Sequence, residues 1–113
     1  FDKKKFNLTI NNLKSANKAL EFYAKKNLLE NSFFNSKKNN IVLSKDFFIQ
    51  PNEIILRSIT KVIQKISESY YPPRGKSIKS LIIEIKYNKT MKKLTLGRCI
   101  FEKINETVII SKE

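Results

Sequence analysis

The amino-acid sequence predicts an α+β fold, with about three helices followed by a small antiparallel β-hairpin or sheet at the C-terminus. Two features of the apolar pattern predict this order. Up to about residue 86 the apolar residues recur every three or four positions, as on a helix with one buried face, and from residue 94 they alternate, as on a strand. The length of 113 residues, with 41% hydrophobic and 29% charged residues, is typical of one globular domain.

The first helix is expected from about residue 8 to residue 29. Its buried stripe consists of side chains three and four positions apart: Leu13, Ala16, Leu20, Tyr23 or Ala24, and Leu28. Residues 31–40 are rich in Asn, Ser and Lys and are typical of a loop or turn, whereas Ile41-Val42-Leu43 predicts a short strand. Phe47-Phe48-Ile49 is then expected to pack inward.

The second helix is expected to begin near Pro51, because proline is favoured in a first turn, and Glu53 complements the positive start of the helix dipole. Its apolar stripe is Ile55, Ile59, Val62, Ile63 and Ile66. The helix is expected to fade over residues 67–69 and must end before Pro72, since proline excludes helical geometry at the residue before it. A shorter third helix is expected from residue 76 or 77 to residue 86, with a buried face made of Ile78, Leu81, Ile82 and Ile85.

The C-terminal part of the chain is expected to form strands. Alternation predicts one buried face, made of Leu94, Leu96, Cys99, Phe101, Val108 and Ile110. Gly97 interrupts the alternation and indicates a bulge or tight bend. A turn at Asn105-Glu106 would join residues 98–103 and 107–111 in a hairpin. Cys99 is expected here to be a small buried apolar residue, and we do not assign it as a nucleophile.

The residue inventory excludes several classes of site. The chain has no His and one Cys, so it lacks the side chains for an ordinary zinc site or for a Ser-His-Asp or Cys-His centre. Its two glycines, Gly75 and Gly97, lie too far apart for a glycine-rich phosphate loop. No apolar run exceeds three residues, so no membrane span is expected, and one cysteine fits a reducing cytoplasm. The acids show no paired spacing for acid-base catalysis; the four considered are Asp46, Glu53, Glu68 and Glu84.

The charge balance is strongly basic. Lys and Arg total 23 against 10 acids, which gives a net charge of +13. Lys, Asn and Ile make up 48 of the 113 residues, a bias that AT-rich coding produces, so part of the lysine content is compositional drift. Two interpretations therefore stay open: a surface for a polyanionic partner, or a lysine-coated domain without one.

The segment from Arg74 to Arg98 carries eight basic residues against the single acid Glu84. Phosphate contacts come mainly from such side chains, and arginine binds phosphate better than lysine because its planar guanidinium can donate two hydrogen bonds at once. We therefore take six residues as candidate nucleic-acid contacts, although a merely solvated face is the alternative: Arg74, Lys76, Lys79, Lys92, Lys93 and Arg98.

Four aromatic residues could stack on unpaired bases: Phe47, Phe48, Tyr70 and Tyr71. For the two phenylalanines, packing between a strand and a helix is the favoured interpretation. For Tyr71, which precedes Pro72, packing of the turn is favoured.

Three pieces of the sequence, in this order, resemble the region that follows the catalytic domain in bacterial tRNA(Ile)-lysidine synthases. They are Ile55-Leu56-Arg57, then Tyr71-Pro72-Pro73-Arg74-Gly75, then Thr95-Leu96-Gly97-Arg98-Cys99-Ile100 before a hairpin that ends in Val108-Ile109-Ile110-Ser111-Lys112-Glu113. The resemblance covers about residues 41–113, and residues 1–40 match only as a helical lead-in. The family often has a second glycine where this chain has Arg98.

The resemblance implies a division of labour. Enzymes of this family bind ATP, with Mg, in an N-terminal domain, adenylate the wobble cytidine of a minor isoleucine tRNA, and let lysine displace AMP. Their catalytic Ser-Gly-Gly-x-Asp-Ser signature is absent from this sequence, so no catalytic residue is carried over. Residues 41–113 are then expected to bind tRNA beside a catalytic domain. The chain starts at Phe1 and its one Met is Met91, so we expect a piece of a longer protein.

Two other functions remain open at this stage. One is a structural domain that dimerises through the edge of the C-terminal hairpin or docks on a catalytic partner, since exposed strand edges pair readily. The other is a free-standing basic RNA-binding module.

Overall fold

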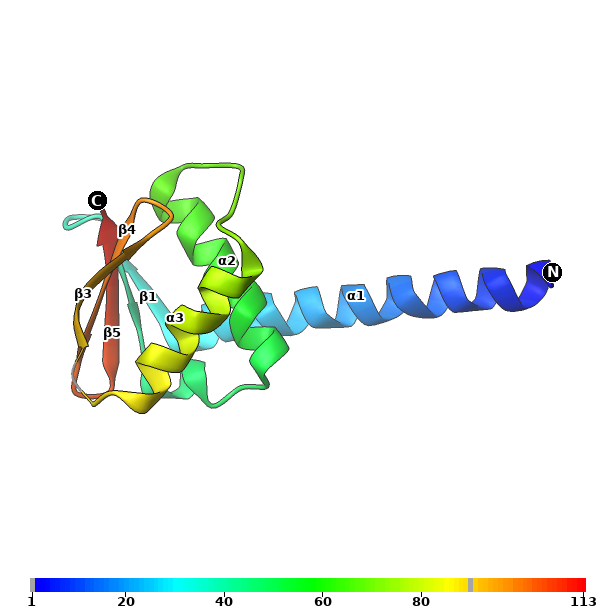
Figure 1. The fold of residues 1–113 in the computed structure, drawn as a ribbon, viewed down its shortest axis with the longest axis horizontal. Coiled ribbons are helices and arrows are strands. Elements are labelled where there is room, and N and C mark those ends of the chain that lie inside the picture. The colour runs from blue at the N-terminus through cyan, green and yellow to red at the C-terminus, as the bar shows by residue number, and fades with distance from the viewer. Residues whose placement is uncertain (1, 90) are drawn as a thin grey trace.

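The α+β prediction is confirmed in the computed structural model, which describes residues 2–89 and 91–113. The described part contains the helices α1 (Lys3–Asn31), α2 (Asn52–Ser67) and α3 (Gly75–Tyr87), a 3-10 turn η1 (Lys45–Phe48), and the strands β1 (Ser32–Asn35), β2 (Asn40–Leu43), β3 (Met91–Leu96), β4 (Cys99–Ile104) and β5 (Thr107–Lys112). The strands form one sheet in the order β1-β2-β5-β4-β3, and every neighbouring pair is antiparallel. Helices α2 and α3 cover one face of this sheet (Figure 1).

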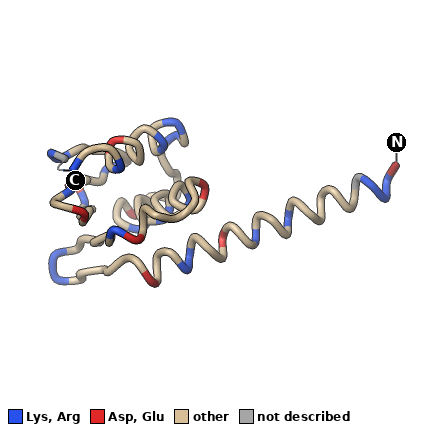
Figure 2. The backbone as a smooth tube through the Cα atoms, turned by 90° about the horizontal axis from the view of Figure 1, so that it is seen from below, with Lys and Arg blue, Asp and Glu red and all other residues tan. Residues whose placement is uncertain are grey.

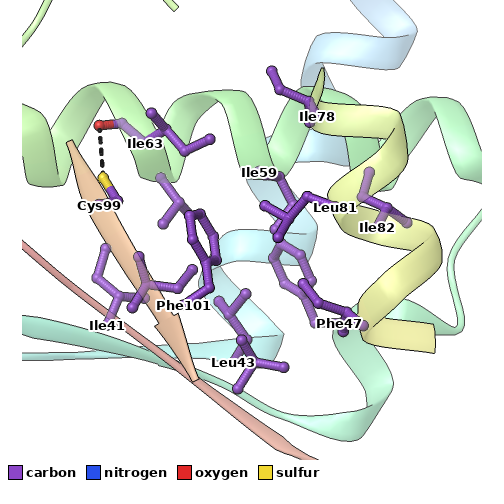
Figure 3. Close-up of a cluster of buried hydrophobic side chains, with 14 of the residues drawn as sticks. Ile41, Leu43, Phe47, Ile59, Ile63, Ile78, Leu81, Ile82, Cys99 and Phe101 are labelled. Atoms are coloured by element: carbon purple, nitrogen blue, oxygen red, sulfur yellow. Dashed lines mark hydrogen bonds between the residues drawn. The ribbon is translucent and has the colours of Figure 1, made fainter. Parts of the chain in front are cut away.

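The core lies between that sheet face and the two helices (Figure 3). The stripes predicted for α2 and α3 are buried at every position, and so are the inward residues of β2, β4 and β5: Ile41, Leu43, Cys99, Phe101, Val108 and Ile110. Phe47 of η1 is fully buried in the same cluster, as the sequence predicted. Because the period of each element places its apolar side chains on one face, helix and strand can share a single core.

Helix α1 is longer than predicted and packs over only part of its length. The Asp2 carboxylate caps it by accepting hydrogen bonds from the backbone N–H groups of Lys4 and Lys5. Near its C-terminal end Ala24 is buried against the body of the domain, whereas Leu13, on the same predicted stripe, is 66% exposed. The N-terminal half projects away from the body (Figure 1). Among the described residues, no helix is long and apolar enough to cross a membrane.

Three further local predictions are wrong: a loop over residues 31–40, an inward Ile49, and a buried Leu94, which is 38% exposed on the edge strand β3. The segment expected to be a loop over residues 31–40 contains β1, which pairs with β2, and only residues 36–39 form the turn. Asn and Ser at the two ends of β1 disfavour strands, but Phe33 and Phe34 between them favour one, and pairing with β2 stabilises it. Ile49, the C-cap residue of η1, was expected to pack inward and is 66% exposed, whereas Phe47 and Phe48 before it pack on the core.

The C-terminal hairpin is confirmed, with Asn105 at a φ of 57° in its turn. Its edges are not free: β5 also pairs with β2, and β4 also pairs with β3. The edge strands of the described sheet are β1 and β3, so both edges of the hairpin are already paired within the chain.

The bend predicted at Gly97 is a two-residue turn between β3 and β4. Gly97 and Arg98 both have positive φ angles, 59° and 64°, as a hairpin turn of type I′ requires. A Cβ atom on Gly97 would lie 2.7 Å from Cγ of Pro73 and 2.8 Å from Cγ2 of Ile63. The turn can therefore rest on Pro73 only with glycine at position 97.

We predict that Gly97→Ala lowers the free energy of unfolding by about 2–4 kcal/mol, since it adds left-handed backbone strain to a steric clash. Urea unfolding followed by circular dichroism would measure the loss. Gly75→Ala is the matched control, because a Cβ at Gly75 has no heavy atom within 4 Å. Equal stability of the two variants would contradict the prediction.

Candidate nucleic-acid interface

All six predicted contact residues are exposed, and none forms an ion pair with another described residue. Arg74 is the N-terminal cap residue of α3, and Lys76 and Lys79 lie on that helix. Lys92 and Lys93 lie on the edge strand β3, and Arg98 lies in the turn that follows it. Their charges are thus available to a partner.

The contact between Gly97 and Pro73 brings two of the resembling pieces together. Arg74 follows Pro73 and Arg98 follows Gly97, so the two guanidinium groups extend from neighbouring stretches of backbone. We call this region, formed by residues 70–75 and 97–98, the Tyr-Arg corner. No described acid lies in the first turn of α3, and no side chain caps that turn. The positive end of the helix dipole therefore adds to the potential of the two arginines.

Arg98 occupies a backbone conformation that favours glycine. Its φ is 64°, in the left-handed region that glycine adopts with the least strain. The backbone N–H of Glu113, directly after β5, donates a hydrogen bond to the carbonyl of Arg98 at 2.9 Å and so ties the turn to the end of β5. Another acid at this end of the sheet, Glu68, pairs with Lys112 at 3.8 Å.

The loop between α2 and α3 presents two tyrosines to solvent. Tyr70 is 84% exposed and Tyr71 is 82% exposed, and their rings meet edge to face at 5.4 Å between centroids. The interpretation that Tyr71 packs the turn is therefore wrong. Pro73 fills that role instead, because its ring lies directly under Gly97. The interpretation of Phe47 and Phe48 as packing residues is confirmed: Phe47 is fully buried, and Phe48 packs against the core while partly exposed.

Side-chain hydrogen bonds hold the backbone of this loop. Nε2 of Gln64 donates to the carbonyl of Tyr70 at 2.7 Å, and the backbone N–H of Tyr71 donates to Oγ of Ser69 at 3.3 Å. Helix α2 ends at Glu68 with a φ of 56°, which turns the chain away from the helix axis. The two exposed tyrosines therefore extend from a stretch of backbone that hydrogen bonds hold in place.

Lys76 directly follows the corner on α3, whereas Lys79, Lys92 and Lys93 do not join it. Lys92 and Lys93 lie near the start of β3, and a strand rises about 3.3 Å per residue, which separates them from Arg98 by roughly 15–20 Å. Lys79 lines a cavity of about 570 Å³ between α2 and α3, together with Lys86 and Tyr87. Basic residues also lie on α1 and on the β1–β2 turn (Figure 2). The predicted basic track is therefore a corner plus separate lysines.

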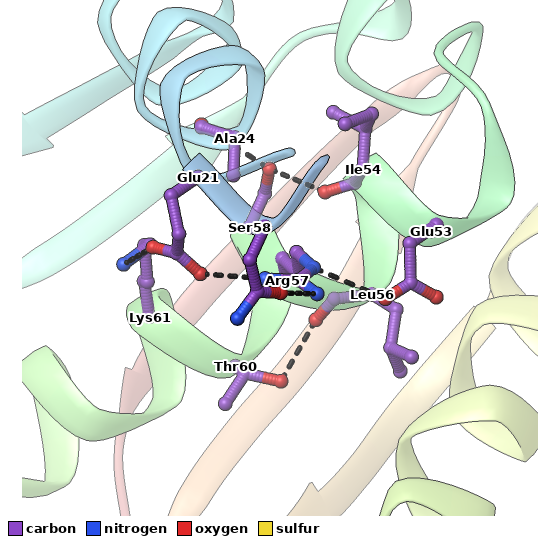
Figure 4. A network of polar contacts seen from close by, with 10 residues as sticks. Glu21, Ala24, Glu53, Ile54, Leu56, Arg57, Ser58, Thr60 and Lys61 are labelled. Atoms are coloured by element: carbon purple, nitrogen blue, oxygen red, sulfur yellow. Dashed lines mark hydrogen bonds and ion pairs between the residues drawn. The ribbon is translucent and has the colours of Figure 1, made fainter. Parts of the chain in front are cut away.

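Arg57 forms a network of hydrogen bonds and ion pairs that the sequence did not predict (Figure 4). Its guanidinium donates to the carboxylates of Glu53 and Glu21, both at 3.0 Å, and to Oδ1 of Asn17 at 2.8 Å. Hydrogen bonds from Lys61, and then from Arg57, hold the pKa of Glu21 below its usual value against the opposing effect of burial. The network ties α1 to α2, so Arg57 serves the fold and its charge is already matched.

Cys99 is fully buried, as predicted from the sequence. Its Sγ lies 3.7 Å from the carbonyl oxygen of Ile63, and burial raises the pKa of the thiol to about 11. The sulfur is therefore a neutral thiol at physiological pH and does not act as a nucleophile.

The geometry favours an extended ligand over a small molecule, because the Tyr-Arg corner combines two exposed rings with two guanidinium groups that form no ion pair with a described acid. Guanidinium groups donate paired hydrogen bonds to phosphates, and nucleic-acid bases stack on the faces of aromatic rings. In comparisons with known proteins, no family model, curated protein or solved structure matches this chain.

We predict that Arg57→Ala lowers the free energy of unfolding by about 1–2 kcal/mol, because it removes two partly buried ion pairs. Arg57→Lys should retain only part of this stability, since lysine lacks the planar guanidinium that bonds both carboxylates. Thermal unfolding would measure both variants. Lys18→Ala on α1, an exposed position, should leave stability unchanged. An equal loss in the Lys18 variant would show that the network does not hold α1.

The neutral thiol of Cys99 predicts a pH dependence at the alkaline end. Because its pKa rises from 9.0 to about 11 on folding, the unfolded chain loses this proton first, and the associated stability is lost as the pH rises from 9 to 11. The midpoint of urea unfolding should fall more steeply over this range for the wild type than for Cys99→Ala. Parallel curves for the two proteins would contradict the prediction.

Proposed function

We propose that this chain is a tRNA-binding region of a cytoplasmic tRNA(Ile)-lysidine synthase. It would act beside an N-terminal catalytic domain that binds ATP and Mg. One observation carries the proposal: two sequence pieces that resemble this family, residues 71–75 and 95–100, meet at the Tyr-Arg corner. They bring together two exposed arginines there, Arg74 and Arg98.

The chain's part in such an enzyme is to hold RNA. A net charge of +13 attracts a polyanion from a distance, whereas the guanidinium groups of Arg74 and Arg98 can each donate two hydrogen bonds to phosphate oxygens. The third arginine, Arg57, is matched by Glu21 and Glu53 and contributes little to this field. Lysine and ATP are small and need a pocket, but selecting one tRNA needs an extended basic surface.

A docking function is the second candidate, and the projecting half of α1 favours it. Leu8 and Leu13 are 61% and 66% exposed there, on a helix segment that extends beyond the body. Helices in water gain most of their stability from packing an apolar face, so this segment fits a protein neighbour. Sedimentation at several concentrations would reveal self-association, and a dimer that binds no RNA would favour this function.

We predict that Arg74→Ala/Arg98→Ala weakens binding of a minor isoleucine tRNA transcript roughly tenfold at low salt, because each arginine makes a charge-assisted hydrogen bond. The slope of log affinity against log salt should fall by about one unit per lost phosphate contact. Titrations of labelled tRNA at several salt concentrations would measure both quantities.

Lys37→Ala/Lys38→Ala is the matched control, since it removes the same charge from the β1–β2 turn near the opposite edge of the sheet. It should leave the salt slope closer to the wild-type value. Affinity of the wild type that does not change between low and high salt, or equal effects of the two double variants, would overturn the proposed role of the corner.

A further inference from the structure

We propose that Tyr70 and Tyr71 stack on unpaired bases, so that the Tyr-Arg corner takes a single-stranded segment of RNA in preference to a duplex. This inference rests on the proposed RNA-binding function and names the form of RNA that the corner recognises.

The exposure of the two rings is the first argument. More than four-fifths of each tyrosine is open to solvent, and the ring neighbour of each is the other tyrosine, in an edge-to-face contact with an interplanar angle of 88°. An edge-to-face pair leaves ring faces open. Large aromatic surfaces of this kind are the stacking platforms of proteins that bind single strands.

The second argument is that the backbone that carries the two rings is held in position before a ligand arrives. The backbone of Tyr70 accepts a hydrogen bond from Gln64, and Ser69 bonds the backbone of Tyr71. Pro72 and Pro73 follow, with φ fixed by their rings, and Pro73 is seated under Gly97. Ordering this loop therefore costs little on binding, and less of the stacking energy is spent on it.

The third argument is the position of the charges relative to the rings. Arg74 lies three residues after Tyr71, and Arg98 joins it across the Gly97 contact. Single-strand sites combine stacked bases with cationic side chains along the backbone. In a duplex the base faces are hidden in the stack, so the exposed tyrosine rings would have no open base face to stack on.

Tyr87 provides an internal comparison. It is 83% exposed, as open as the two corner tyrosines, but it lies at the opposite end of α3. Lys86 beside it donates a hydrogen bond to Asn52. Exposure is thus matched, whereas the paired ring and the neighbouring arginines are missing at Tyr87.

The test uses the full chain and an oligouridine of about eight nucleotides, within the usual length of such sites. The chain has four tyrosines and no tryptophan, so its intrinsic fluorescence reports on tyrosine, and stacking should quench it. Tyr70→Leu/Tyr71→Leu should weaken binding at least fivefold, since each stacked base contributes severalfold in affinity. Tyr70→Phe/Tyr71→Phe keeps both rings and should bind like the wild type.

Two further measurements complete the test. Tyr87→Leu should leave affinity unchanged, and an RNA duplex of the same length should bind the wild type more weakly than the single strand. The inference is overturned if the leucine variant binds oligouridine as the wild type does, or if the duplex binds as tightly as the single strand. Salt-dependent tRNA binding that needs Arg74 and Arg98 but not the tyrosines would overturn stacking and leave the proposed function standing. Tyrosine-dependent oligouridine binding without tRNA binding would overturn the proposed function and leave stacking standing.

Discussion

The close approach of Gly97 to the ring of Pro73 is the contact on which the candidate interface depends. It joins the loop after α2 to the turn between β3 and β4, and the same glycine also lies against Ile63 of the core. Position 97 must therefore be glycine for two reasons, its left-handed backbone and the absence of room for a Cβ. Without this contact Arg74 and Arg98 would be displayed by two independent loops. With it, they share a corner that is fixed to the centre of the domain.

The positive charge of the chain serves more than one purpose. Arg57 is used in the fold, where it links α1 to α2 through Glu21 and Glu53. Many lysines lie on elements far from the corner and fit the lysine-rich composition that AT-rich coding produces. Arg74 and Arg98 differ from both groups, because they are exposed, unmatched by a described acid, and placed beside two open aromatic rings. Arg98 also accepts a backbone conformation that glycine would adopt with less strain.

Regular periodicity made much of the fold predictable. Helices α2 and α3 lie within one or two residues of the predicted ranges, because their isoleucine and leucine stripes are long and regular. Strand β1 was not predicted, although Phe33 and Phe34 at its centre favour strands, because Ser and Asn flank them and both rings are exposed, so no buried alternating face marks the segment. The sheet order was equally hidden, because β2 pairs with β5, far along the chain.

The candidate interface was predictable only in parts. Sequence resemblance pointed to both pieces of the corner, but neither composition nor period indicates that Pro73 and Gly97 touch. The exposure of Tyr71 could not be foreseen, since a tyrosine before proline can either pack or protrude. The i,i+4 spacing of Glu53 and Arg57 was visible, whereas the partner Glu21 comes from another helix. Long-range contacts of this kind separate structural arginines from available ones.

Ultraviolet crosslinking of the chain to tRNA, with the modified peptides identified by mass spectrometry, tests the central claim most directly. The account predicts crosslinks at Tyr70 and Tyr71 and in the peptide that contains Arg98, which together make up the Tyr-Arg corner. Crosslinks confined to α1 or to the β1–β2 turn, with the corner unmodified, would contradict it.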